Sequence, residues 1–257
     1  VTIFDAGEDH DLAYIAMEFL PGADLTHACS PHQLLTVPLV LSIAARVANA
    51  LDYAHAHNVV HRDIKPANIM FDSATDTVKV TDFGIARITD ASKTRTGLVL
   101  GTPSFMSPEQ LSGKKIDGRS DLYSLGVTLF QLLTGCLPLR GEYLMEWMKK
   151  IANAEPPDIH QLRPDLPPAV ASAVAFALQK RPEARYQTGQ QFAHALQEVT
   201  RDSAFAPTPT SAPQAPQAVV YDASRDATGH DGVDFQETVM EPPAVRNAAS
   251  PPLSGAR

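Results

Sequence analysis

The sequence reads His61-Arg62-Asp63-Ile64-Lys65-Pro66-Ala67-Asn68 in its first third, and Asp82-Phe83-Gly84 follows after a short interval. Together the two segments supply two carboxylates, a lysine and a carboxamide. Such a set can hold a metal-bound polyphosphate beside a hydroxyl group that is about to lose its proton. That chemistry requires the intervening chain to bring these side chains together.

The intervening chain has the pattern of a β-hairpin. Residues 69–71 and 78–81 are strand-like segments on either side of the polar segment 72–77. Asn68 then immediately precedes the first strand and Asp82 immediately follows the second, so antiparallel pairing brings them to the same end. A carboxylate and a carboxamide oxygen suit Mg²⁺, which takes its remaining ligands from water and phosphate.

Asp63 and Lys65 complete this group. Asp63 lies five residues before Asn68 and is expected on the loop facing the metal, where a carboxylate can orient a hydroxyl group and accept its proton. Lys65 directs a compact positive charge at the transferring group. Taken singly, Asp-Phe-Gly is a common turn, His61 a core histidine and Lys65 a surface charge. The combination, in this order, favours the functional interpretation.

The remaining chain predicts further strands and several helices. Residues 1–4 and 13–17 are expected to pair across a polar turn at residues 5–11, with Gly7 in the turn. Apolar residues spaced by three and four predict a helix over Val40, Ile43, Val47, Leu51 and Ala54. Further helices are expected over residues 121–133, which are apolar almost all round, over about 168–180, and from Thr188 onward. Residues 83–116 are predicted to form a long functional loop.

The composition excludes some classes of function. A formal net charge of −8 argues against binding to nucleic acid, which needs a basic surface. Two widely separated cysteines, Cys29 and Cys136, lack metal-ligand spacing and indicate a reducing, cytoplasmic location. No apolar run is expected to reach the ~20 residues of a membrane span. Residues 201–257, rich in Ala, Pro, Ser and Thr, predict a disordered tail.

Three motifs carry a resemblance to a known family. His61 to Asn68 resembles the catalytic loop of eukaryotic-type protein kinases, and Asp82-Phe83-Gly84 resembles their metal-binding motif. Ser107-Pro108-Glu109 resembles the motif that closes the activation segment, with Ser in place of the usual Ala. The run from Gly101 to Gln110 is close to the version in bacterial serine/threonine kinases. The resemblance covers Val1 to about Val199.

The resemblance implies an α+β, protein-kinase-like fold with a mainly helical C-lobe and a partial β N-lobe remnant. The expected parts are residues 1–17 for the last two N-lobe strands, 18–22 for the hinge, 23–200 for the C-lobe with catalytic loop and activation segment, and 201–257 for the tail. It also implies transfer of the ATP γ-phosphate to Ser/Thr hydroxyls of protein substrates, and a kinase dimer for trans-autophosphorylation.

The resemblance assigns roles residue by residue. It implies Asp63 as catalytic base, Lys65 on the γ-phosphate, and Asn68 and Asp82 as ligands of Mg²⁺ or Mn²⁺. For ATP it implies Met17 as gatekeeper, Glu18, Phe19 and Leu20 as hinge, Met70 as adenine floor, and Asp24 as ribose contact or else a solvated loop carboxylate. Structural roles fall to His61, Phe83, Glu109, Asp121 and Arg185: Asp121 is expected to anchor the catalytic-loop backbone, and Glu109 to pair with Arg185.

Regulation is also expected. Arg62 and Arg87 are predicted to converge beneath the activation loop, where Thr94 and Thr96 are the preferred phosphoacceptors. The position of Lys65, two residues after Asp63, and of Thr102, before Ser107-Pro108-Glu109, resembles the pattern of serine/threonine kinases rather than that of tyrosine kinases.

Two alternatives stay open. Residues 1–257 contain no Gly-rich phosphate loop and no strand lysine before the catalytic loop, for which Lys79 and Lys93 are poor substitutes. The chain is therefore either an N-terminally truncated fragment of an active kinase, which the intact catalytic loop favours, or a pseudokinase that serves as a scaffold. Weak ATP binding and little phosphotransfer are expected of residues 1–257 alone. A small-molecule phosphotransferase of the aminoglycoside-kinase type is disfavoured by the segment from Thr102 to Glu109.

Overall fold

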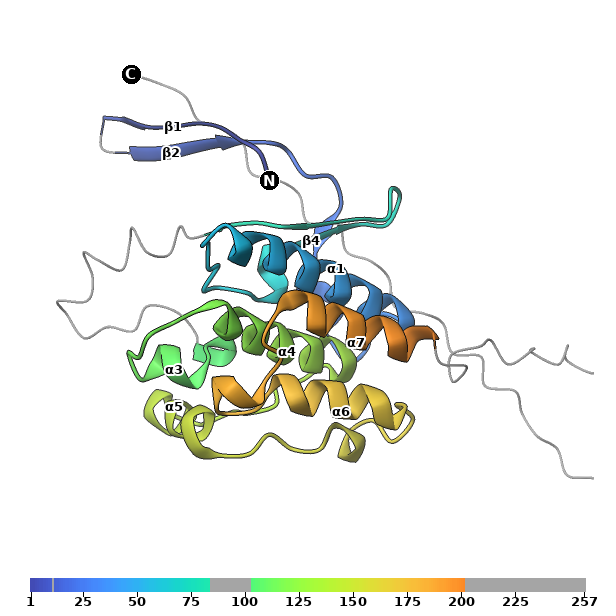
Figure 1. Cartoon of the computed structure of the whole chain (residues 1–257). Helices are drawn as coiled ribbons and strands as arrows, with labels where there is room; N and C mark the ends of the chain where they lie inside the picture. Colours follow the sequence, from blue (N-terminus) through green and yellow to red (C-terminus); the bar gives the residue numbers. More distant parts are fainter. Residues whose placement is uncertain (11, 84–102, 202–257) are drawn as a thin grey trace, which may run out of the picture. The chain divides into compact units, whose positions relative to one another are not determined.

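The computed structural model describes residues 1–10, 12–83 and 103–201. All of them lie in the first of two units of the chain, Val1–Thr208. The described part contains two small β-sheets and a larger set of helices (Figure 1), which confirms the expected α+β class.

The first sheet is an antiparallel pair, β1 (Ile3–Asp9) and β2 (Leu12–Met17). The expected turn at residues 5–11 is therefore wrong for residues 5–9, because β1 continues to Asp9. Gly7 lies opposite Tyr14 rather than in a turn, and a Cβ atom there would come within 2.9 Å of the Tyr14 hydroxyl oxygen. Tyr14 Oη donates to Asp5 Oδ2 at 2.9 Å. This ring crossing over a glycine holds the strands together beyond the predicted boundary.

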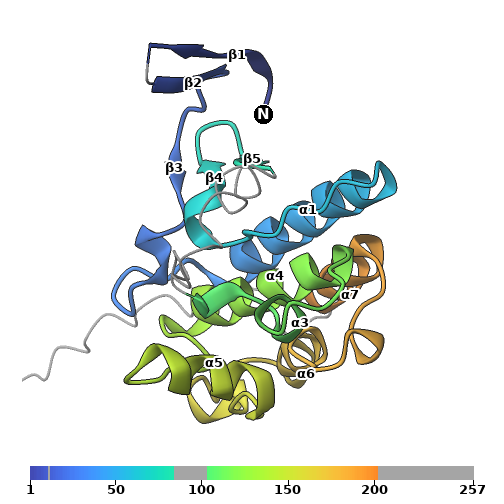
Figure 2. The same ribbon diagram turned by 90° about the vertical axis from the view of Figure 1, so that its left-hand side faces the viewer.

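The second sheet contains the predicted hairpin. Strands β4 (Ile69–Asp72) and β5 (Thr77–Val80) pair antiparallel with Ile69 opposite Val80. A third strand, β3 (Ala23–Asp24), adds to β4 and was not predicted, since two residues carry no periodicity (Figure 2). Gly22 precedes it with φ of +92°, and a Cβ atom there would collide with the backbone at Phe71. Glycine therefore allows the chain to reach the edge of β4.

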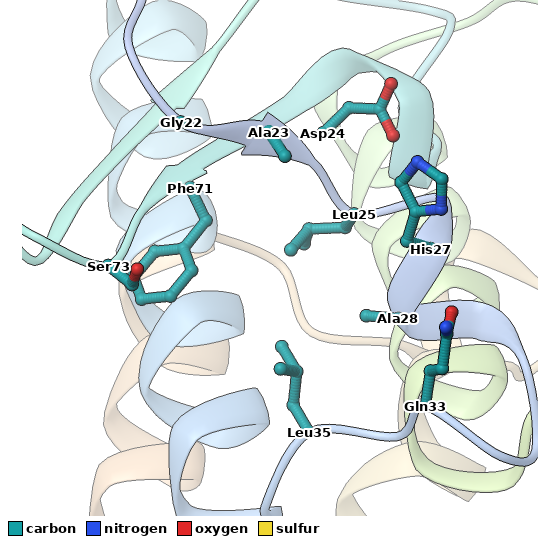
Figure 3. A pocket seen from close by; sticks show the side chains of 10 residues that line it. All are labelled: Gly22, Ala23, Asp24, Leu25, His27, Ala28, Gln33, Leu35, Phe71 and Ser73. Carbon is teal, nitrogen blue, oxygen red and sulfur yellow. The ribbon is translucent and has the colours of Figure 1, made fainter.

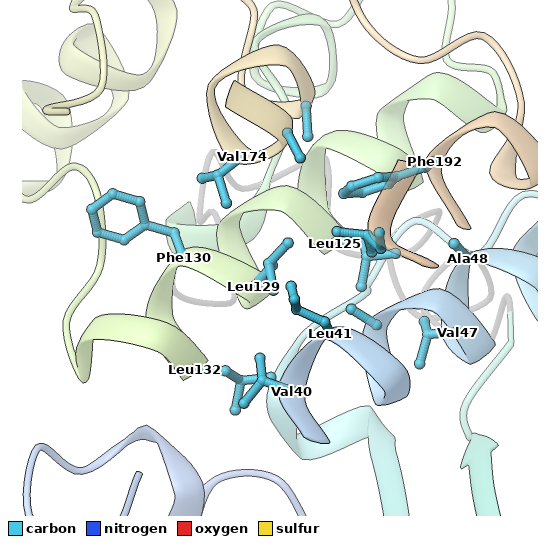
Figure 4. Close-up of a cluster of buried hydrophobic side chains, with 14 of the residues drawn as sticks. Val40, Leu41, Val47, Ala48, Leu125, Leu129, Phe130, Leu132, Val174 and Phe192 are labelled. Carbon is cyan, nitrogen blue, oxygen red and sulfur yellow. The ribbon is translucent and has the colours of Figure 1, made fainter. Parts of the chain in front are cut away.

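The core lies among four helices. They are α1 (Val37–Ala56), α4 (Gly118–Thr134), α6 (Pro168–Ala177) and α7 (Gly189–Arg201), and each covers a region predicted to be helical. Figure 4 shows Leu41 from α1, Leu125 and Leu129 from α4 and Phe192 from α7 directed into one cluster, and all four are fully buried. Helix α4 is buried on nearly every side, as its all-round apolar pattern predicted, and ends at Gly135 with φ of +76°.

Helix α1 corrects one expectation. It has 20 residues with a mean hydropathy of 1.2, so by length and composition it is long and apolar enough to cross a membrane. In the structure it packs against α4 and α7, and nine of its residues are buried there. Its apolar surface is thus accounted for by the protein core.

Several elements were not predicted. Helix α5 (Leu144–Asn153) buries Ile151, while α3 (Pro108–Leu111) and the 3₁₀ helix η4 (Pro103–Phe105) interrupt the expected loop of residues 83–116. The remaining 3₁₀ helices are η1 (His27–Cys29), η2 (Pro66–Asn68), η5 (Ile159–Gln161) and η6 (Pro182–Ala184). Such short elements depend on caps and tertiary contacts rather than on a repeating apolar pattern.

We expect Leu125→Ala to lower the free energy of unfolding by about 2–5 kcal/mol, because it leaves a cavity among α1, α4 and α7. Urea unfolding followed by circular dichroism measures the change. The matched control is Leu144→Ala on the exposed start of α5, for which we expect a loss below about 1 kcal/mol. Equal losses in the two variants would contradict the assignment of the core.

Candidate active site

The loop before β4 brings Asp63, Lys65 and Asn68 into contact. Asp63 Oδ2 accepts hydrogen bonds from Lys65 Nζ at 2.7 Å and from Asn68 Nδ2 at 3.0 Å. Asn68 Nδ2 also donates to the Asp63 carbonyl at 2.7 Å. The Asp63 and Lys65 side chains stay 41% and 36% exposed, so a molecule from solvent can reach them.

The hairpin brings Asp82 to the same end as Asn68, as predicted. Thr81 N donates to the Asn68 carbonyl at 3.0 Å, so Asp82 follows one residue beyond this bond, with φ of +61°. Strand β5 ends at Val80 rather than at the predicted Thr81. Asn68 is buried and its amide nitrogen is used by Asp63, which leaves Oδ1 to meet a cation. This oxygen and the Asp82 carboxylate are hard ligands that fit Mg²⁺.

His61 connects the loop to the end of the hairpin. Its Nδ1 accepts from Asp63 N at 3.2 Å, so the ring hydrogen belongs on Nε2, which donates to the Thr81 carbonyl at 2.7 Å. The Phe83 ring lies 4.6 Å from the His61 ring, centroid to centroid. His61 is fully buried. Its contacts therefore hold the loop that carries Asp63 at a fixed distance from the end of the hairpin that leads to Asp82.

Asp121, in the first turn of α4, holds the backbone of the same loop. Its Oδ2 accepts from His61 N at 2.8 Å and its Oδ1 from Arg62 N at 2.7 Å, which is the contact expected of it. His55 Nε2 lies 2.8 Å from Oδ2 and provides a third partner. Arg62 has φ of +71°, a left-handed conformation that is uncommon for a residue with a side chain.

Glu109 and Arg185 form the expected ion pair within the protein. Arg185 donates to both carboxylate oxygens of Glu109, at 2.7 and 2.9 Å, and Ser120 Oγ donates to one of them at 2.6 Å. Burial alone would raise the pKa of Glu109, but the hydrogen bonds from Arg185 and Ser120 outweigh it and hold the pKa below its usual value. The guanidinium also lies 4.7 Å from the centre of the Tyr123 ring.

Three of the residues expected at the nucleotide line two separate cavities rather than one. A cavity of ≈220 Å³ is lined by Leu20, Met70 and Lys79 among others. Asp24 lines a second cavity of ≈480 Å³, into which Leu25 and Phe71 point (Figure 3). The Asp24 carboxylate accepts from Thr26 N at 2.8 Å.

The expected gatekeeper Met17 and the other two expected hinge residues, Glu18 and Phe19, line neither of these cavities. Met17 is 40% exposed and Phe19 is 90% exposed. Glu18 pairs with Lys79 and accepts from Thr2 N at 3.0 Å. The hydrogen bonds from Lys79 and Thr2 lower the pKa of Glu18 to about 2. Lys79, which sequence reasoning treated only as a poor substitute for the strand lysine, thus holds the hinge against β5.

The regulatory residues are mostly beyond the described chain. Arg87, Thr94, Thr96 and Thr102 lie outside the described residues. Arg62 is described, and its buried Nε finds no hydrogen-bond partner within residues 1–10, 12–83 and 103–201. The N–H group at this nitrogen can therefore donate a hydrogen bond to an anionic oxygen.

Sequence reasoning missed two residues of the site. Gln110 donates through Nε2 to the Arg62 carbonyl at 2.9 Å, and the Ser107-x-x-Gln110 capping pattern was a signal that could have drawn attention to it. No local pattern connects His55 with Asp121, which lies 66 residues further along the chain.

We expect Glu109→Gln to cost about 3–5 kcal/mol at pH 7, because Arg185 is left buried without its counter-charge. Glu109 contributes stability above the pKa of an unfolded carboxyl and loses it as the pH falls through its lowered folded pKa. The difference between wild type and variant should therefore shrink below about pH 4.5. Urea unfolding from pH 7 to 3 tests this, with Glu198→Gln on the exposed surface of α7 as control. A constant difference would contradict it.

Comparison of the sequence with known proteins identifies the family to which the chain belongs. Residues 1–197 match the family described as protein kinase domain. The chain is 38% identical over 271 aligned positions to serine/threonine-protein kinase pkn3 of Myxococcus xanthus, covering 95% of this chain and 49% of pkn3. It is 41% identical over 202 positions to Pkn1 of the same organism, covering 77% of this chain and 29% of Pkn1. With PrkC of Bacillus subtilis the identity is 38% over 191 positions, covering 74% and 29%.

Comparison with solved structures agrees with this assignment of the fold. The crystal structure of Rad53 1-466 in complex with AMP-PNP superposes with a TM-score of 0.64 at 24% identity, covering 75% of this chain and 48% of that one. The chain spans about half the length, or less, of the curated relatives it matches. The fold is the protein kinase fold, and the chain belongs to the bacterial Hanks-type serine/threonine protein kinases.

Proposed function

We propose that the protein transfers the γ-phosphate of ATP to serine and threonine hydroxyls of protein substrates. The observation that carries the proposal is the contact set of Asp63, Lys65 and Asn68, held at the end of the hairpin that leads to Asp82. A carboxylate, an ammonium group and a carboxamide gathered around one accessible point provide for positioning and electrostatic stabilisation, which supply most of the catalysis in phosphoryl transfer.

Asp63 is proposed as the base. Its exposed carboxylate can orient the acceptor hydroxyl and take its proton, while the Asn68 amide holds the carboxylate in place. Lys65, which contacts Asp63 in the structure, would balance the negative charge that collects at the transferring group.

Asn68 and Asp82 are proposed to hold Mg²⁺ or Mn²⁺ together with ATP. When bound, the metal neutralises charge on the phosphates. The ≈220 Å³ cavity, which Met70 and Leu20 line, supports a place for the adenine ring, with Met70 proposed as its floor. Met17, Glu18, Phe19 and Asp24 are proposed as the further nucleotide contacts, for which the present geometry offers less support.

Regulation by phosphorylation of the activation loop is proposed as well. The unsatisfied, buried Nε of Arg62 supports it, because a phosphate on Thr94 or Thr96 would bring oxygens that pair with arginine. A kinase dimer would allow one copy to phosphorylate the loop of the other.

We expect Asp63→Asn to lower phosphate incorporation into a protein substrate by about 100-fold or more, since the variant keeps the shape but loses the base. Incorporation from γ-labelled ATP with Mg²⁺ measures this, for residues 1–257 alone and, where the gene encodes residues before Val1, for the chain that includes them. Glu198→Gln on α7 is the control and should match the wild type. Thermal melting checks that the variants remain folded.

The scaffold alternative is tested in the same samples. ATP with Mg²⁺ should raise the melting temperature of the wild type, and Asp82→Asn should abolish the part of this shift that depends on Mg²⁺. A wild type with neither a shift nor phosphate incorporation in either form would overturn the kinase proposal in favour of a scaffold.

We expect replacement of both Thr94 and Thr96 by Ala to abolish phosphorylation of the activation loop and to reduce activity, because Arg62 loses its anionic partner. Mass spectrometry of loop peptides and substrate assays report the two effects. Unchanged activity in the double variant would contradict this regulatory mechanism.

A further inference from the structure

The residue directly before Asp63 has a strained backbone that must be held in place. Arg62 adopts φ of +71°, a left-handed conformation that is sterically unfavourable for an L-residue with a side chain. Conformations of this kind persist only where the surroundings determine them from several sides. The neighbours of the Arg62 peptide groups therefore bear directly on where Asp63 is presented.

Both peptide groups of Arg62 are held. Its N–H donates to Asp121 at 2.7 Å. Its carbonyl accepts from Gln110 Nε2 at 2.9 Å, and the N–H of the same peptide group, that of Asp63, donates to His61 Nδ1 at 3.2 Å. The plane from which the Asp63 side chain departs is thus fixed at its two ends, by Gln110 and by His61.

The orientation of the Gln110 amide is itself determined. Oε1 accepts from Ser107 N at 2.9 Å and from Ser107 Oγ at 3.0 Å, so Nε2 is the end that meets the Arg62 carbonyl. Ser107 is fully buried, and its hydroxyl also accepts from Gln110 N at 3.3 Å, which completes a capping box at the start of α3. Glutamate would serve this box as well as glutamine, but its carboxylate would face the Arg62 carbonyl without a hydrogen.

We propose that Gln110 is a positioning residue for catalysis: its amide fixes the Arg62–Asp63 peptide group and thereby makes the presentation of Asp63 depend on the position of α3. The inference rests on the proposed kinase function for its effect on rate. Helix α3 also carries Glu109, whose pair with Arg185 anchors the helix to the core. A displacement of α3 therefore moves the base.

Three variants separate the two roles of the Gln110 side chain, which are the cap with Ser107 and the hydrogen bond to the Arg62 carbonyl. Gln110→Glu keeps the cap and loses the donor to Arg62, Ser107→Ala loses the hydroxyl and keeps that donor, and Gln110→Ala loses both. We expect Gln110→Glu and Gln110→Ala to lower kcat by about tenfold or more with KM for ATP little changed, since a small misplacement of a catalytic group is costly. Ser107→Ala should lower the melting temperature while kcat stays within about twofold of the wild type.

The pH dependence provides a readout that a purely structural role would not move. When the carboxylate introduced by Gln110→Glu is protonated, it regains a hydrogen for the Arg62 carbonyl, so the kcat of this variant relative to wild type should rise as the pH is lowered. The other titratable groups around the loop are common to both proteins and cancel in this ratio; they are Asp63, Asp121, His55, His61 and Glu109. Gln110→Ala should show no such recovery. A ratio independent of pH, or equal kcat losses in Ser107→Ala and Gln110→Glu, would overturn the inference.

Amide hydrogen exchange keeps the inference testable apart from the proposed function. Peptides covering residues 58–69 should exchange faster in Gln110→Glu than in wild type, and at the wild-type rate in Ser107→Ala. If the wild type transfers no phosphate, the proposed function fails and exchange alone decides the inference. Equal exchange in Gln110→Glu and wild type would then overturn it.

Discussion

The carboxylate of Asp121 is the interaction on which the rest of the site depends. It is fully buried at the start of α4, the helix whose residues are enclosed on nearly every side. Because both of its oxygens are occupied by His61, Arg62 and His55, this buried helix determines the path of the loop before Asp63. A buried charge with several donors is stable only where those donors stay in place, so loop and helix constrain each other.

A second constraint approaches from α3. This four-residue helix is too short to be stable by itself. It is held by its capping box and by the pair between Glu109 and Arg185, and through Gln110 it reaches the carbonyl of Arg62. The left-handed backbone at Arg62 is therefore clamped between α4 and α3, which is the kind of local strain that functional sites retain.

The side of the site toward β1 and β2 is organised differently. Both strands are largely exposed, and the contact between Glu18 and Lys79 joins the connector after β2 to β5. The register that places Met70 opposite Lys79 puts both residues beside one cavity, which Leu20 also lines. Asp24 belongs to another cavity. The residues proposed for catalysis are thus gathered closely, whereas the residues expected at the nucleotide are spread over a wider surface.

The sequence by itself determined α1, α4, and the hairpin that brings Asn68 and Asp82 to one end, because apolar periodicity and antiparallel pairing are local rules. The family resemblance, rather than any pattern of spacing, pointed to Asp121. Only the tertiary structure decided the contact of Gln110 with the loop, and the placement of Leu20 and Met70 at one cavity and of Asp24 at another. These features depend on how elements far apart in the chain pack together. A local sequence pattern carries no information about such long-range packing.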